Sequence, residues 1–335
     1  MAPQLQVRKH YMFTTGSKLS PSIDIANFWR ARWMSLVAST AFQFNPAVQP
    51  RAFIVLGYLG REEIDDDLLY QILVALRGAL AIFNDSDPNL VTSIMMCLKN
   101  VVESLPSNSR YLLQLFWVAV VLVEINTGPT FAMAVELLQA VVRALDSNGF
   151  FSGDTMIDVL LAAREPIADV ARQLDNLCGV NFDSHFSFAI AGIFMKGLRY
   201  NEVKDAIYHG LHTFLDIERK QFSSYGLSEE SSIIEASTLG YVAGLLPLAA
   251  KNDTVKDLLK IAGLTETDID SHILNGRAYA GIFDKLDIPD NTTALLLVSL
   301  ISNMLNAADN ESERLFIYGL LSEAAIAIPE VFPLM

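Results

Sequence analysis

The chain has few of the residues that build disulfide frameworks or flexible linkers. Of its 335 residues only two are cysteines, Cys97 and Cys178, and both lie in apolar stretches. Thiols in such surroundings are typical of packing residues in a reducing compartment. Glycine and proline are also sparse, at 18 and 12 residues. Because no polar, repetitive stretch resembles a linker, we expect an almost wholly ordered chain.

Positive charge is scarce as well, since 24 lysine and arginine residues face 38 aspartate and glutamate residues, for a formal net charge of −14. A field of this sign repels phosphate backbones and anionic lipid head groups, which argues against binding to nucleic acid or to membrane surfaces. The longest apolar stretch, residues 111–123, is shorter than the roughly 20 residues that span a bilayer. The first 19 residues lack the apolar segment of a signal peptide. We therefore expect a cytoplasmic protein without direct membrane insertion.

Helical periodicity is what the sequence has in abundance. Apolar residues recur at steps of three and four, as in Phe131, Val135, Leu138 and Val142. We expect no β-hairpin, because strand alternation is absent and Asn148-Gly149 is followed by more loop. Helix starts and stops predict about fifteen helices, near residues 20–44, 48–59, 65–83, 88–106, 109–125, 130–146, 153–163, 165–177, 184–197, 202–221, 229–250, 253–262, 266–284, 290–308 and 311–327.

The connections between these helices are short, which favours antiparallel neighbours. Residues 111–124 are apolar almost all round and therefore need neighbours on every side. Stacked helix pairs provide such surroundings, so we predict an all-α, HEAT- or armadillo-like solenoid. A compact multi-helix bundle is the alternative, since no strict sequence period is present. We expect residues 1–19 to form a flexible tail and residues 20–335 to form a single helical-repeat domain.

Four strings in the chain resemble one protein family in their residues and their order. They are NPAVQPRAFIVLG at 45–57, LFWVAV at 115–120, GVNFDSHFSFAIAGIFMKGLR at 179–199 and EAAIAIPEVFP at 323–333. Together they resemble the C-terminal helical region of neurofibromin and of its fungal Ira-type relatives, the Ras GTPase-activating proteins. The resemblance covers residues 25–335.

This resemblance implies a HEAT-like scaffold segment of a negative regulator of Ras signalling. In that family the helical region contributes to a homodimer, while a separate domain activates the GTPase. Because this chain lacks that domain and the lipid-binding module, the resemblance implies a non-catalytic segment. Its expected partners are other proteins, including a second copy and other domains of a parent Ras regulator that is recruited peripherally to membranes. No cofactor, metal or small-molecule substrate is expected.

The residues that match the family pattern are expected to be mainly structural. They are Asn45, Pro46, Pro50, Arg51, Phe116, Trp117, Asn181, Phe182, Ser184, Phe186, Lys196, Gly197, Arg199, Pro329, Phe332 and Pro333. Phe116 and Trp117 are surrounded by apolar residues and are predicted to lie in the core. Asp183 or Ser184 is predicted to be the N-cap of the following helix.

Three arrangements suggest chemistry, and each has a plainer structural interpretation. Arg61, Arg110 and Arg199 could each be an arginine finger, but solvated or helix-capping arginines look the same. The row Asp205, His209, His212 and Asp216 lies along one helix, where four ligands cannot converge on one ion.

A third arrangement places His185 near Cys178 in sequence, which suggests a nucleophile pair. Cys178 ends an apolar helix, however, and is predicted to be an inert packing thiol. The polar segment 222–232 is either a phosphorylation site or, more simply, a helix connection.

Two hypotheses of different classes remain. The first is the interaction scaffold, which expects exposed apolar surface on its terminal helices. The second is an armadillo-type adaptor that binds basic peptides through an acidic groove. The adaptor hypothesis expects a regular ladder of asparagines or tryptophans, which Trp29, Trp33 and Trp117 do not form.

Overall fold

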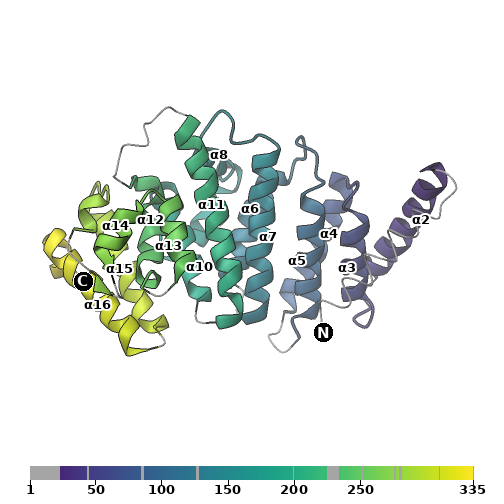
Figure 1. Ribbon diagram of the computed structural model, residues 1–335. Coiled ribbons are helices and arrows are strands. Elements are labelled where there is room, and N and C mark those ends of the chain that lie inside the picture. The colour runs from purple at the N-terminus through teal and green to yellow at the C-terminus, as the bar shows by residue number, and fades with distance from the viewer. Residues whose placement is uncertain are drawn as a thin grey trace. The chain divides into compact units, whose positions relative to one another are not determined.

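The computed structural model describes residues 23–334, apart from 44, 84–86, 126–127, 199, 225–233, 251, 275–276, 279–280 and 309. Within these residues the chain is all-α, with fifteen α-helices, several 3₁₀ turns and one pair of two-residue strands (Figure 1). It divides into two compact units, one ending at Leu105 and one beginning at Pro106. A single domain over 20–335 stays a prediction, and residues 1–19 lie outside the described part.

The first unit contains four helices, in which α3 packs against α2 and α5, and α4 packs against α5. Their bounds are α2 Ile23–Phe42, α3 Gln49–Leu59, α4 Asp66–Ala81 and α5 Asn89–Val102. The side chain of Asp65 caps α4 by accepting a hydrogen bond from the backbone N–H of Leu68 at 2.7 Å. Gly57 allows α3 to approach α5, because a Cβ there would lie 2.8 Å from the Cα of Cys97.

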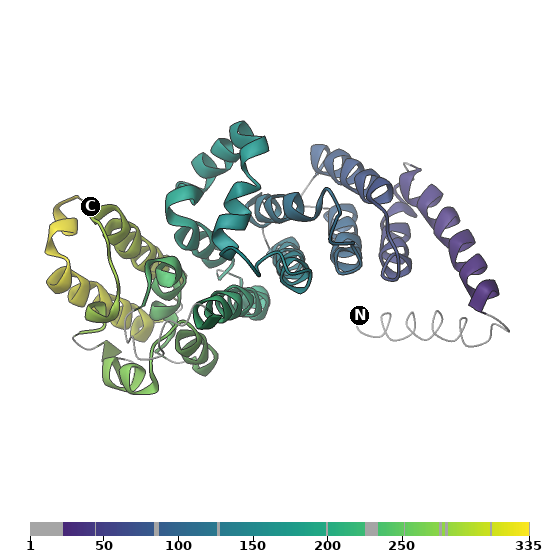
Figure 2. The same cartoon turned by 90° about the horizontal axis from the view of Figure 1, so that it is seen from above.

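The second unit begins with six helices and two 3₁₀ turns. They are α6 Leu112–Ile125, α7 Gly128–Ser147, α8 Met156–Ala162, η1 Glu165–Ile167, α9 Ala168–Cys178, α10 Phe182–Gly197, η2 Asn201–Val203 and α11 Lys204–Ser224. Helix α10 is central, since it contacts α6, α7, α8, α9, α11, α12 and α15. Helices α6, α7 and α11 stand side by side in Figure 1 and are seen nearly end on in Figure 2.

The rest of the second unit alternates shorter helices with 3₁₀ turns. Its elements are α12 Ala236–Leu245, η3 Leu246–Leu248, α13 Asp253–Ile261, α14 Glu266–His272, η4 Phe283–Lys285, α15 Asn291–Asn303, η5 Met304–Ala307, α16 Glu311–Ala327 and η6 Pro329–Leu334. Helix α12 packs on α10 and α15, and α13 packs on α11. The predicted all-α repeat architecture is therefore confirmed, and each predicted helix has a counterpart.

The predicted helix over 266–284 is wrong in its second half. Helix α14 ends at His272, and the antiparallel strands β1 Ile273–Leu274 and β2 Arg277–Ala278 follow. The expectation of no β-hairpin is therefore wrong as well. Between these strands the sequence reads Asn275-Gly276, a strong hairpin signal that the sequence analysis overlooked. Ile234 and Leu286 form an additional parallel bridge nearby.

The all-apolar helix α6 lies in the surroundings that its composition demands. Eight of its residues, from Leu112 to Val123, are buried, and the helix packs against α7 and α10. No single described helix is long and apolar enough to cross a membrane. Within the described part of the chain, one pair of segments, Glu165–Cys178 and Phe182–Gly197, passes such a test together, although the two are bent by 48° against each other.

Candidate functional site

The longest family-like string forms the central helix of the second unit. Eleven of the sixteen residues of α10 are buried, including Phe182 and Phe186. Their rings meet Phe116 and Trp117 of α6, with centroid distances of 5.3 Å between Trp117 and Phe182 and 6.1 Å between Phe116 and Phe186. Trp117 is 3% exposed, and its indole N–H donates to the backbone oxygen of Leu160 at 3.0 Å. The prediction that Phe116 and Trp117 lie in the core is confirmed.

A buried arginine completes this aromatic cluster. The guanidinium of Arg164 lies 4.8 Å from the Trp117 ring centroid and 5.2 Å from that of Phe182. It pairs with Asp175 at 2.5 Å and with Asp183 at 2.9 Å, and it donates to the backbone oxygen of Ala171 at 3.0 Å. Sequence reasoning did not single out Arg164, because one arginine in the segment Arg164-Glu165-Pro166 carries no pattern that reveals its burial.

Lys196 and Gly197 occupy structural positions at the end of α10. Lys196 pairs with the largely buried carboxylate of Glu124 on α6. Gly197 lies against the ring of Phe131, and a Cβ there would stand only 2.2 Å from its Cε1 atom. The glycine is therefore required by the close approach of α10 to α7. Arg199 lies outside the described residues.

The start of α10 differs from the prediction that Asp183 or Ser184 is its N-cap. Asn181 has extended backbone angles, and its side chain accepts a hydrogen bond from the N–H of Asp183 at 2.8 Å. The helix thus begins at Phe182, because the Asn181 side chain already caps the free N–H of Asp183. Asp183 instead pairs with Arg164, and Ser184 is exposed.

The remaining family-like residues lie at helix ends. In the first unit Asn45 accepts from the N–H of Ala47 at 3.1 Å, Pro46 follows in the same turn, and Pro50 stands in the first turn of α3 with Arg51 exposed beside it. In the second unit Pro329 opens η6, Phe332 is half-buried, and Pro333 lies inside η6.

The residues that suggested chemistry are not assembled into a reactive site. Burial raises the pKa of the Cys178 thiol to about 12, with a smaller contribution from Glu124, so the reactive thiolate is disfavoured. His185 faces the ring of Phe188 at 6.3 Å. Among the described residues no hydrogen bond joins it to Cys178.

The candidate metal ligands and the candidate arginine fingers also have ordinary structural surroundings. His209 and His212 are exposed on α11, and Asp216 pairs with Lys220 at 2.8 Å. No group of three or more metal-ligating side chains occurs within the described residues. Arg61 lies over the ring of Tyr58 at 4.8 Å, and Arg110 lies over that of Tyr111 at 5.5 Å.

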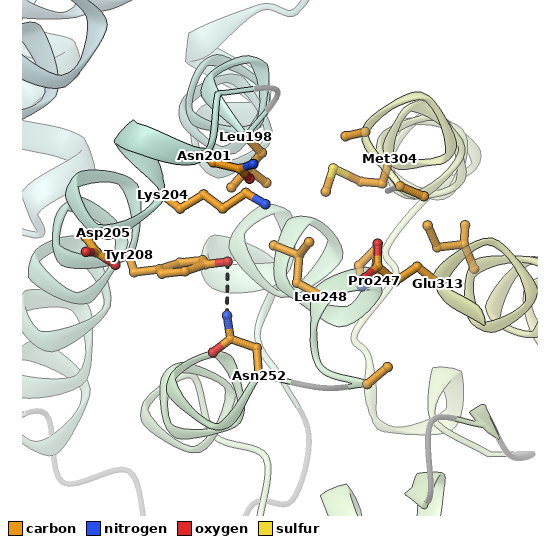
Figure 3. Close-up of a pocket in the computed structure, with 14 residues that line it drawn as sticks. Leu198, Asn201, Lys204, Asp205, Tyr208, Pro247, Leu248, Asn252, Met304 and Glu313 are labelled. Carbon is orange, nitrogen blue, oxygen red and sulfur yellow. Dashed lines mark hydrogen bonds between the residues drawn. The ribbon is translucent and has the colours of Figure 1, made fainter. Parts of the chain in front are cut away.

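The structure reveals a cavity of about 400 Å³ just beyond the C-terminal end of α10 (Figure 3). Lys204 and Tyr208 of α11 and Leu248 of η3 point into it, and Met304 of η5 reaches it from the other side. The hydroxyl oxygen of Tyr208 accepts a hydrogen bond from Asn252 at 3.1 Å. Burial raises the pKa of Tyr208, so the phenol stays neutral.

A second cavity, of about 390 Å³, lies at the opposite end of α10. The backbone of His185 breaks the helix here, with φ −141° and ψ 51°. Ser184, Phe186 and Asp290 line it together with hydroxyl-bearing residues of α12 and α15. Neither cavity was predicted, because both are assembled from helix ends far apart in sequence; the only local signals were the capping asparagine and aspartate, Asn252 and Asp290.

Comparison with known proteins gives a distant likeness. No family model matches this chain. Over 188 residues, 55% of this chain, it is 23% identical to the inhibitory regulator protein IRA2 of Saccharomyces cerevisiae. The matched region amounts to 6% of that relative. The chain is therefore distantly similar to a short part of a much longer inhibitory regulator, in agreement with the Ira-type resemblance of its sequence strings.

Proposed function

We propose that this chain is a non-catalytic, HEAT-like scaffold segment of a neurofibromin-like negative regulator of Ras signalling. The observation that carries the proposal is the 188-residue similarity to an inhibitory regulator. The family-like residues Phe116, Trp117 and Phe182 support it, because they are buried in the second unit and line neither cavity. On this proposal the chain works in the cytoplasm and its partners are proteins.

Exposed apolar side chains on the outer helices suit such a scaffold. In the first unit Phe28, Trp29, Trp33 and Leu36 of α2 are all more than half exposed. In the second unit Leu315 and Tyr318 of α16 are 63% and 57% exposed. Ile326 lies two further turns along the same face of α16. Apolar surface of this kind is a usual feature of protein–protein contacts.

The proposal is tested by molar mass in solution, measured by light scattering after size exclusion over a dilution series. A dimer that persists on dilution, and that Leu315→Glu with Tyr318→Glu dissociates without lowering the melting temperature, would support an assembly surface on α16. Thr254→Glu adds a carboxylate at an exposed position of α13 and is the control. A monomer at every concentration would contradict self-association by this segment.

The non-catalytic part of the proposal has its own test. We expect the purified chain to leave the rate of GTP hydrolysis by Ras unchanged, because the family's activating domain is separate from its helical region. An acceleration that Arg61→Ala or Arg110→Ala removes would identify an arginine finger and overturn the proposal.

A further inference from the structure

The first and the last α-helices of the described chain both expose apolar faces. The α2 face consists of four large side chains that are each 51–61% exposed, Phe28, Trp29, Trp33 and Leu36. The α16 face consists of three that are each 57–74% exposed, Leu315, Tyr318 and Ile326. Helical-repeat proteins normally present polar residues on the outer sides of their outermost helices. These two faces are apolar instead, so their burial against a partner is favourable.

The spacing of the side chains makes each face a continuous row. Trp29, Trp33 and Leu36 follow one another at steps of four and three residues, which places them on one side of α2. Phe28 extends this row, because its ring meets that of Trp29 edge to face with the centroids 6.0 Å apart. The rows are roughly 12 Å long on α2 and roughly 16 Å long on α16 at about 1.5 Å per residue. Another helix can therefore lie along either of them.

One cation on the α2 face decides which partner suits it. Arg32 is exposed and stands midway along the row formed by residues 28–36. Two α2 faces packed symmetrically about that midpoint would place two guanidinium groups side by side, which is unfavourable. Arg30 lies off the row and pairs with Glu62 and Glu63, so it does not change this repulsion. The α2 face therefore suits a partner other than the same face of a second copy.

The α16 face offers a carboxylate to this cation. Glu311 is exposed and stands four residues before Leu315 and seven before Tyr318, so it extends the α16 row. Arg314 is exposed at the edge of the row, but α16 holds three glutamates against this one arginine. An exposed ion pair contributes little affinity. The charges thus select between partner faces, while apolar contact provides the binding.

We propose that the α2 face of one copy packs against the α16 face of a second copy, so that the chains associate head to tail. The inference rests on the scaffold function proposed above and names the two surfaces that meet. The half-exposed side chains of α2 offer on the order of 400 Å², and a similar area on α16 gives roughly 800 Å² in all. Such an area is small for a specific interface, so the association is weak and depends on concentration.

Mixing two variants of the full chain tests this pairing. Trp29→Glu with Trp33→Glu blocks the α2 face, and Leu315→Glu with Tyr318→Glu blocks the α16 face. Each variant alone should show a dissociation constant at least roughly tenfold above that of the unmodified chain in sedimentation velocity. An equimolar mixture should regain a complex of one copy of each variant, because one intact face of each kind remains.

Val74→Glu on α4 is the matched control, since Val74 is 51% exposed, as Trp33 is, and lies off both faces. It should leave the association unchanged. Circular dichroism and melting temperatures check the fold of every variant, and Trp29→Gln with Trp33→Gln replaces the α2 variant if the glutamates unfold it.

Three results would overturn the head-to-tail pairing, and they differ in what they leave standing. Undiminished association of the α2 variant, together with loss in the α16 variant, would show a symmetric contact between two α16 faces and would keep the scaffold proposal. A mixture that stays monomeric while the unmodified chain associates would show that the two faces do not meet. An unmodified chain that is monomeric at every concentration would contradict self-association by any face.

Discussion

At the scale of single residues, Arg164 lies between two of the family-like aromatic side chains, Trp117 and Phe182, and contacts both rings. Its side chain is 5% exposed, and a buried guanidinium is tolerated only when it is paired and hydrogen-bonded. Asp175 and Asp183 provide the charges, and the rings of Trp117 and Phe182 provide two faces that attract the cation. One side chain thus connects α6, α9 and α10.

Arg164→Met is expected to lower the free energy of unfolding by about 3–5 kcal/mol, because it leaves the largely buried Asp175 without its partner. The matched control is Arg172→Met on α9, where the arginine is 73% exposed and pairs with exposed Asp169. That change is expected to cost less than about 1 kcal/mol. Urea denaturation of both variants provides the comparison, and equal losses would contradict the structural role of Arg164.

Glu218 is a second buried titratable residue, and among the described residues no cation pairs with it. Burial raises the pKa of its carboxyl group to about 8, and the nearby Glu235 adds to the shift. Tyr241 lies close enough for Glu218 to raise its pKa as well, after the larger effect of burial. At neutral pH the folded protein therefore holds Glu218 protonated, whereas the unfolded chain ionises it.

This difference makes stability depend on pH. As the pH rises from the unfolded pKa near 4.5 towards the folded pKa near 8, the folded state binds the extra proton and its stability falls. Glu218→Gln removes this loss, so we expect its stability advantage over the unmodified protein to grow by about 2–4 kcal/mol between pH 5 and pH 8. Denaturation curves at the two pH values measure the change, and a constant difference would show that Glu218 is ionised in the folded protein.

At the scale of elements, the contact between α10 and α12 depends on one glycine. A Cβ at Gly240 would lie 2.2 Å from the backbone nitrogen of Phe188. The N–H of Gly240 also donates to the hydroxyl of Ser187 at 3.2 Å. The two helix backbones therefore touch directly, and no flexible side chain can yield to an added methyl group.

Gly240→Ala is expected to destabilise the protein by about 1–3 kcal/mol or more, despite the higher helix propensity of alanine. Gly192→Ala, on α10 itself, is the matched control, because a Cβ there meets nothing within 4 Å. That variant should be stabilised by up to about 1 kcal/mol. Thermal melts of the two variants should therefore show a lower melting temperature for Gly240→Ala and an equal or higher one for Gly192→Ala. Equal changes in the two variants would contradict the close approach of α10 and α12.

At the scale of the whole molecule, charge sets the conditions for any self-association. Two copies that each carry a net charge of −14 repel one another. Salt screens this repulsion, whereas contacts between apolar side chains such as Leu315 and Tyr318 are little weakened by it.

We therefore expect the dimer of the scaffold proposal to tighten when ionic strength rises from about 0.01 M to about 0.15 M. Sedimentation velocity at the two salt concentrations measures the dissociation constant. A dimer that weakens with added salt would instead be held together by ion pairs, and the apolar face of α16 would not be its interface.

The sequence predicted the helices well because their signals are local. The helix predicted near residues 65–83 starts where Asp65 caps α4. Phe116 and Trp117 are buried, as the apolar residues around them in the sequence predicted. The failures were local as well. Asn181, and not its neighbours, caps α10, and the residues after His272 turn into strands.

Sequence alone determined that this chain is all-α, acidic and rich in interior packing residues, since periodicity and composition are properties of the chain itself. Only the tertiary structure showed that Arg164 is buried between Trp117 and Phe182. It also assembled the cavity around Tyr208 and Asn252. These sites join residues separated by tens of positions, and the burial and pairing of a polar side chain depend on which helices pack around it.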